Sequence, residues 1–166
     1  MKFTKHLKEM SACGEAVDWV GRRDLKTAWR DCKRGDWMLW FAGRLDIDRK
    51  LLVLAACDCA ETALKYVPEG EDRPARCIQA SRNWCNGTAS MDDVRAAGRD
   101  AAAAATDAAA YAAYAAAYAA DAYAADAAAY AAYAADTAYA REKSHKTCAD
   151  LVRKRIPVSI IQKAMK

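Results

Sequence analysis

The stretch from Asp100 to Ala140 reads DAAAAATDAAAYAAYAAAYAADAYAADAAAYAAYAADTAYA, and it decides the fold class. It holds 27 Ala, seven Tyr, five Asp and two Thr, and no other residue type. Alanine has the highest helix propensity, and neither glycine nor proline interrupts the chain from Asp100 to Arg155. The stretch therefore predicts helix over its whole length, and we call it the Ala/Tyr/Asp tract.

The Ala/Tyr/Asp tract is amphipathic in an uncommon way. At about 100° per residue, its tyrosines and aspartates gather on one side, led by Asp100, Asp107, Tyr111, Tyr114, Tyr118, Asp121, Asp136 and Tyr139. Tyr123, Asp126, Tyr130 and Tyr133 widen that side, and the opposite side is nearly pure alanine. The pattern predicts one aromatic, acidic face and one smooth face that another helix can approach closely.

A single helix over the tract would be about 60 Å long at 1.5 Å per residue. A compact chain of this size is only about 40 Å across. The mismatch favours a hairpin of two or three packed helices, with Asp121 or Asp126 as a cap at the break. One long helix is the alternative.

The rest of the chain also carries helix signals, with no alternating strand pattern. Asp24 is placed to cap a helix, Pro74 to begin one, and Gly87 to end it. We expect helices over 4–10, 15–21, 24–32, 37–43, 48–67, 73–85, from 91 onward, and over 137–155. The fold class is therefore all-α, a compact multi-helix bundle with the Ala/Tyr/Asp tract as a long helix or a helical hairpin.

We expect a single helical domain over residues 1–157. Its first part, 1–99, contains all five tryptophans, and its second part, 100–157, contains the tract. Residues 158–166 are interpreted as a loose basic end. Opposite charges divide the chain, with a net −5 over 100–140 and a net +6 after it, so we expect the basic tail to pack near the acidic tract.

Seven cysteines, an odd number, are best explained as reduced thiols in a bacterial cytoplasm. The first residues are charged and lack the apolar stretch that export needs, and no apolar run approaches the roughly 20 residues of a membrane span. We therefore expect a cytoplasmic protein with no membrane partner.

Catalytic and metal-binding patterns are sparse. The two histidines, His6 and His145, lie far apart in sequence, and no phosphate loop, nucleophile elbow or HExxH motif occurs. Cys57 and Cys59 have the wrong spacing for a zinc site and are interpreted as buried packing residues. We expect no enzyme, no metal and no cofactor.

The most informative cluster is the segment CKRGDWMLWFAGRL over 32–45. In one interpretation it is core, with its tryptophans buried, Asp36 capping a helix and an arginine in a salt bridge. In the other it is a binding surface, because Trp and Arg dominate interface hot spots. The two are compatible if the cluster has a buried part and an exposed rim.

This cluster also carries a family resemblance. Together with RKLLVLAACDCAETALKYVP (49–68), RNWCNG (82–87) and CADLVRKRIP (148–157), it resembles the immunity proteins of polymorphic toxin systems, in the group numbered five, whose members also occur in bacteriophages. The resemblance runs from about Asp18 to Pro157. It implies an all-helical, non-catalytic binding protein and assigns no catalytic residue.

Two functions follow as hypotheses. The first is neutralisation of a toxin through the tyrosine and aspartate face, with Tyr111, Tyr114, Tyr118 and Asp121 in contact. The second is a phage counter-defence role, sequestering a nucleotide messenger of antiphage immunity. In that case Trp37 or Trp40 and the tyrosines would stack on bases, and Arg34, Arg44, Arg49 or Arg153 would neutralise phosphates. The candidate binding residues outside the tract are Arg34, Asp36, Trp37, Trp40, Arg44, Arg49 and Arg153.

A third interpretation is self-association through the alanine face, which would make the protein a homo-oligomer. Sequence-specific nucleic-acid binding is disfavoured, because the basic residues are scattered and the longest predicted helix is acidic.

Overall fold

Helices make up the regular structure of the described chain. The computed structural model describes residues 3–104, 108–118, 124–134 and 138–166, and within these ranges it contains no strand. The α-helices are α1 (Phe3–Glu9), α2 (Gly14–Val20), α3 (Leu25–Asp31), α4 (Gly35–Gly43), α5 (Arg49–Glu61), α6 (Arg73–Asn86), α7 (Met91–Ala104), α8 (Ala108–Ala117), α9 (Ala124–Tyr133), α10 (Ala138–Arg155) and α11 (Val158–Ala164). A short 3-10 helix covers Leu64–Tyr66. The all-α prediction is confirmed.

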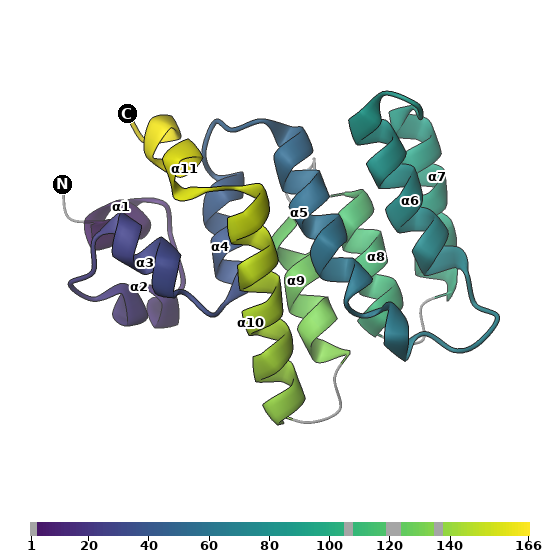
Figure 1. The fold of residues 1–166 in the computed structure, drawn as a ribbon, viewed down its shortest axis with the longest axis horizontal. Helices are drawn as coiled ribbons and strands as arrows, with labels where there is room; N and C mark the ends of the chain where they lie inside the picture. The colour runs from purple at the N-terminus through teal and green to yellow at the C-terminus, as the bar shows by residue number, and fades with distance from the viewer. Residues whose placement is uncertain (1–2, 105–107, 119–123, 135–137) are drawn as a thin grey trace.

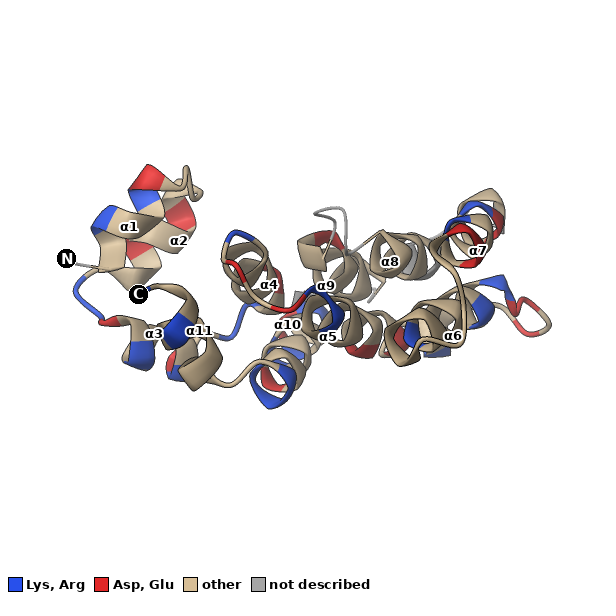
Figure 2. Ribbon diagram, turned by 90° about the horizontal axis from the view of Figure 1, so that it is seen from above, with Lys and Arg blue, Asp and Glu red and all other residues tan. Residues whose placement is uncertain are grey.

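The longer helices form two layers, which Figure 2 shows edge on. One layer is α4, α9, α8 and α7, in that order, and the other is α10, α5 and α6. Helix α5 packs against both α8 and α9, and α10 packs against both α4 and α9, so the layers share one core. The short helices α1–α3 and α11 cover one end, where both termini lie (Figure 1).

The Ala/Tyr/Asp tract folds back on itself, as the length argument predicted. Its α8 and α9 pack side by side, α7 lies beyond α8, and α10 packs against α9. The helices meet through buried alanines, namely Ala112, Ala113, Ala115, Ala116, Ala117, Ala124, Ala127, Ala128, Ala131 and Ala132. The alanine face is therefore covered within a single chain, which gives the homo-oligomer interpretation no support.

The break in the tract differs in detail from the prediction. Asp126 does not precede a helix but lies in the first turn of α9, which begins at Ala124. Asp121, the other expected cap and a candidate binding residue, lies outside the described residues.

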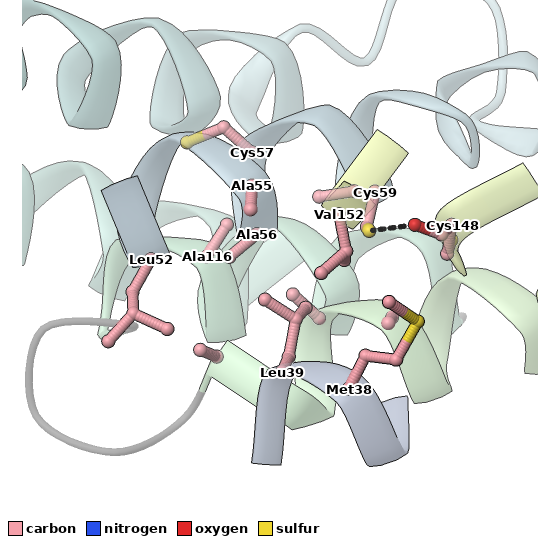
Figure 3. Close-up of a cluster of buried hydrophobic side chains, with 14 of the residues drawn as sticks. Met38, Leu39, Leu52, Ala55, Ala56, Cys57, Cys59, Ala116, Cys148 and Val152 are labelled. Atoms are coloured by element: carbon pink, nitrogen blue, oxygen red, sulfur yellow. Dashed lines mark hydrogen bonds between the residues drawn. The ribbon is translucent and has the colours of Figure 1, made fainter. Parts of the chain in front are cut away.

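The core is built around α5, and Figure 3 shows part of it. Leu39 of α4 and Val152 of α10 are fully buried against this helix. Cys57 and Cys59 are also fully buried, which confirms their role in packing, and the Cys59 thiol points at the Cys148 carbonyl, 3.8 Å away. Burial raises the pKa of Cys57 to about 12, so this thiol stays protonated at neutral pH.

Capping explains where several helices begin and end. Asp24 accepts a hydrogen bond from the Thr27 N–H at 2.7 Å, as predicted for the start of α3. Asp48 caps α5 in the same way. Helix α5 ends at Glu61, earlier than the predicted Val67, because the chain there tightens into the 3-10 turn.

The expectation of a loose end over residues 158–166 is wrong for most of that segment. Residues 158–164 form α11, which packs against α3 and buries Ile161 completely. Just before it, the Trp29 indole N–H donates a 3.2 Å hydrogen bond to the Ile156 carbonyl. The C-terminal helix is therefore part of the fold.

Within the described ranges, no helix is both long and apolar enough to cross a membrane.

Candidate functional site

The RGDW motif, residues 34–37, lies at the start of α4, and α4 packs against α10. Asp36 is not the cap that the sequence suggested, because it lies one residue inside α4 and Arg34 precedes the helix. Arg34 instead donates two hydrogen bonds to the Asp36 carboxylate, at 2.9 and 2.5 Å. The Arg34 guanidinium also lies over the Trp37 ring, 4.5 Å from its centroid. Both charged members of the motif are thus satisfied by each other.

His145 of α10 approaches the same carboxylate. Its Nδ1 lies 3.5 Å from an Asp36 oxygen and has no hydrogen-bond partner. Burial lowers the pKa of the imidazole, and the Asp36 charge offsets this only in part. The ring is therefore neutral at pH 7.

Glycine is required in the motif for steric reasons. A Cβ built on Gly35 would lie 2.5 Å from the Cys148 Cβ and 2.9 Å from the Ala149 nitrogen. Helices α4 and α10 consequently touch at this point with no room for a methyl group. Gly35 therefore sets how closely α4, in one layer, packs against α10, in the other.

Arg153, a candidate binding residue, is used inside the protein. Its guanidinium donates to the carbonyls of Trp29 at 3.1 Å and Cys32 at 2.7 Å, and to the Asp150 carboxylate at 2.6 Å. It therefore ties α10 to the connection between α3 and α4.

The remaining candidate arginines are exposed and lie elsewhere. Arg44 follows α4, with its guanidinium 5.2 Å from the Trp40 ring centroid, and Arg49 is the first residue of α5. Two of the four arginines expected to neutralise phosphates are thus committed to internal partners, and the other two lie beyond the far end of α4. This arrangement does not make an anion site.

A second charged cluster, which the sequence did not point to, joins three helices. The nearly buried Asp58 of α5 accepts hydrogen bonds from Arg155 of α10, at 2.5 and 3.1 Å, and from Arg82 of α6, at 3.0 Å. Arg82 also bonds Glu61 at 2.6 Å. The basic tail does pack near the tract, as expected, since α10 lies against α9. The carboxylate that Arg155 pairs with, however, belongs to α5 and not to the tract.

An aromatic cavity lies between the N-terminal helices and the layer formed by α4, α9, α8 and α7. Its volume is about 220 Å³. Its wall contains four of the five tryptophans and both phenylalanines, namely Phe3, Trp19, Trp29, Trp37, Trp40 and Phe41. Asp36 also lines it, and α9 contributes Ala125, Asp126 and Ala129. Three of the predicted site residues, Asp36, Trp37 and Trp40, therefore meet in this cavity.

The tyrosines of the tract divide between two environments. Tyr111 and Tyr130 stack with their ring centroids 5.5 Å apart and remain exposed, as does Tyr133. Tyr114 and Tyr118 are half-buried and pack on each other at 4.8 Å. Tyr118 also meets Gly98 of α7, where an added Cβ would lie 2.9 Å from its ring. Tyr118 therefore holds α7 against α8.

Helix α9 connects the aromatic cavity to the exposed tyrosines. Asp126, Tyr130 and Tyr133 are spaced by four and three residues, so they share the exposed side of this helix. Ala125, Asp126 and Ala129 line the cavity at the helix's first turns. We call Tyr111, Asp126, Tyr130 and Tyr133 the tyrosine face. The tyrosine face and the cavity wall share Asp126, so this face and the tryptophan cluster meet at α9.

Sequence reasoning did not single out the cavity residues from the first two helices, Phe3 and Trp19. Their only signal was the concentration of large aromatic residues before residue 90. Within the described ranges, no group of three or more His, Cys, Asp or Glu side chains is arranged to hold a metal ion.

Comparison with known proteins identifies the family. The family model described as "Imm-5 like putative immunity protein" matches residues 45–157, which is more than half of the chain. The chain therefore belongs to this family. The matched segment covers α5 to α10 and begins after the RGDW motif. No curated protein and no solved structure gave a match.

Proposed function

With membership of an immunity-protein family as the premise, we propose that this protein neutralises a toxin by binding it and blocking its active site. The proposal assigns the contact to the tyrosine face and the adjoining mouth of the aromatic cavity. In this role the protein covers the toxin's active site and complements its charge, and it catalyses no reaction.

The observation that carries the proposal is the exposure of large aromatic side chains on two packed helices. Tyr111, Tyr130 and Tyr133 expose 43%, 37% and 63% of their surface, although each is large enough to contribute to a core. Tyrosine offers a broad contact area with few rotatable bonds, so little side-chain entropy is lost when a partner covers it. The stack between Tyr111 and Tyr130 orders two of these rings before a partner arrives.

The charge of this region supports a basic partner. Asp126 is the acidic member of the tyrosine face, and the tract as a whole has no Lys or Arg. Active sites that act on nucleic acids are lined by basic residues, and complementary charge raises the rate of association with such a surface. A toxin with a basic cleft, such as a nuclease, is the partner class that fits.

The test is protection and affinity measured with a toxin domain from the same gene cluster. Co-expression of the wild-type protein should restore growth, and the double variant Tyr130→Ala/Tyr133→Ala should fail to do so. Loss of two hot-spot tyrosines at about 2 kcal/mol each, about 4 kcal/mol together, weakens binding by roughly 1,000-fold.

The matched control is Tyr139→Ala. Tyr139 is also highly exposed, at 77%, but it lies on α10 in the other layer. Unchanged toxin affinity in the double variant, or an equal loss in the control, would show that the tyrosine face is not the contact.

A further inference from the structure

The aromatic cavity has the composition of a site for a positively charged group. Four tryptophans and two phenylalanines form its wall, and aromatic ring faces attract cations through their electron density. Trp19 and Trp37 lie 6.2 Å apart with their planes inclined at 59°, so these two rings do not cover each other's faces. Three of the tryptophan rings already attract cations: guanidinium groups of Arg23, Arg34 and Arg44 lie over Trp19, Trp37 and Trp40, at 4.8, 4.5 and 5.2 Å from the ring centroids. At most one face of each of these rings is left for an occupant.

The charged residues in the wall are of one sign. None of the lining residues is Lys or Arg, whereas two, Asp36 and Asp126, are acidic. Asp36 is neutralised by Arg34, with His145 beside it. No described residue makes an ion pair or hydrogen bond with Asp126, and the partial burial of this mostly exposed side chain raises its pKa. Asp126 is thus the carboxylate that an incoming cation would meet.

The size of the cavity restricts the occupant. Sites for drug-sized ligands measure about 300–1,000 Å³, whereas this cavity measures about 220 Å³. A dinucleotide is too large and carries the wrong charge. A single alkylammonium or guanidinium group is small enough.

We propose that the aromatic cavity is a binding site for one organic cation, held by the tryptophan faces and the Asp126 carboxylate. The cation has two sources with the same chemistry: a basic side chain presented by a protein partner, or a free quaternary ammonium compound. This proposal does not depend on toxin binding, so it is tested without a toxin.

The experiment titrates the purified full-length chain with three small probes at constant ionic strength. Choline is the quaternary ammonium, 3,3-dimethylbutan-1-ol is its neutral isostere, and Nα-acetylarginine amide carries a guanidinium. Binding is followed by calorimetry and by tryptophan fluorescence, since four of the five tryptophans line the cavity. At least one cation should bind tenfold or more tightly than the neutral isostere, as expected for a desolvated cation–aromatic contact.

The comparison of the two cations identifies the source. Tighter binding of the arginine amide assigns the site to a partner's side chain, and tighter binding of choline assigns it to a free ammonium compound. Absence of binding by both cations, or binding of neither cation more tightly than the neutral isostere, would overturn the proposal.

A pair of variants separates the site from general effects of charge. Asp126→Asn changes an exposed side chain, so folding is retained, and it should weaken cation binding about tenfold. Asp100→Asn makes the same charge change on α7, away from the cavity lining, and should leave binding unchanged. Undiminished binding to Asp126→Asn would also overturn the proposal.

Discussion

Replacing Gly35 with alanine is expected to destabilise the protein by about 2 kcal/mol. The new methyl group would lie 2.5 Å from the Cys148 Cβ and 2.9 Å from the Ala149 backbone nitrogen, whereas carbon atoms in contact prefer about 3.5–4.0 Å. Neither neighbour is the flexible end of a side chain, so α4 and α10 must separate by about 1 Å. Overpacking of this kind costs about 1–3 kcal/mol. The higher helix propensity of alanine offsets at most about 1 kcal/mol of it.

Urea denaturation followed by circular dichroism measures this loss. With a slope of about 1–3 kcal/mol per molar urea, the midpoint should fall by roughly 1 M. The matched control is Gly43→Ala, at the other end of the same helix, where an added Cβ meets nothing within 4 Å. That variant should be unchanged or more stable by up to about 1 kcal/mol. If Gly35→Ala is as stable as the wild type, α4 and α10 are not in the close contact described.

Three further predictions concern buried charge, protonation and thiol reactivity. Asp58→Asn leaves two partly exposed arginines without their shared carboxylate. It should cost about 2 kcal/mol in urea denaturation, somewhat below the range for fully buried pairs. Asp31→Asn removes one partner of an exposed pair and should cost much less. Equal losses in the two variants would show that the burial of Asp58 does not strengthen its ion pairs. Burial lowers the pKa of His145 below its ordinary value of 6.5. Below pH 6.5 the unfolded state therefore binds more protons than the folded state. The free energy of unfolding should fall as the pH drops through 6.5 and stay level above it. His145→Gln should lose this slope in urea midpoints compared across that pH range. Of the seven cysteines only Cys13 is exposed, so a thiol reagent should modify one thiol per native chain and seven in urea; rapid reaction of several native thiols would count against the burial.

The fold could be predicted from the sequence wherever local rules decide the structure. Alanine propensity predicted helix over the tract, and the length of the tract predicted that it folds back. Asp24 begins α3 by side-chain capping, and Gly87 ends α6 in the left-handed conformation that glycine favours. The segment after Pro157 was mispredicted because its helix depends on burying Ile161 against α3, a contact more than a hundred residues away in sequence.

The candidate site was predicted only in part, for the same reason. Trp37 and Trp40 stood out by residue type, and both line the aromatic cavity. Arg153 also stood out by type, but its partners are carbonyls more than 120 residues away, and no local pattern shows that it is used internally. Asp126 gained its importance only when α9 was placed beside α4.

The aromatic cavity spans the boundary of the family match, so its wall is assembled from two parts of the chain. Most of its wall comes from residues 3–41, which precede the matched segment, while α9 inside that segment supplies one side. Substitutions in the N-terminal helices can therefore change the shape and charge of the cavity while the two-layer scaffold keeps its packing.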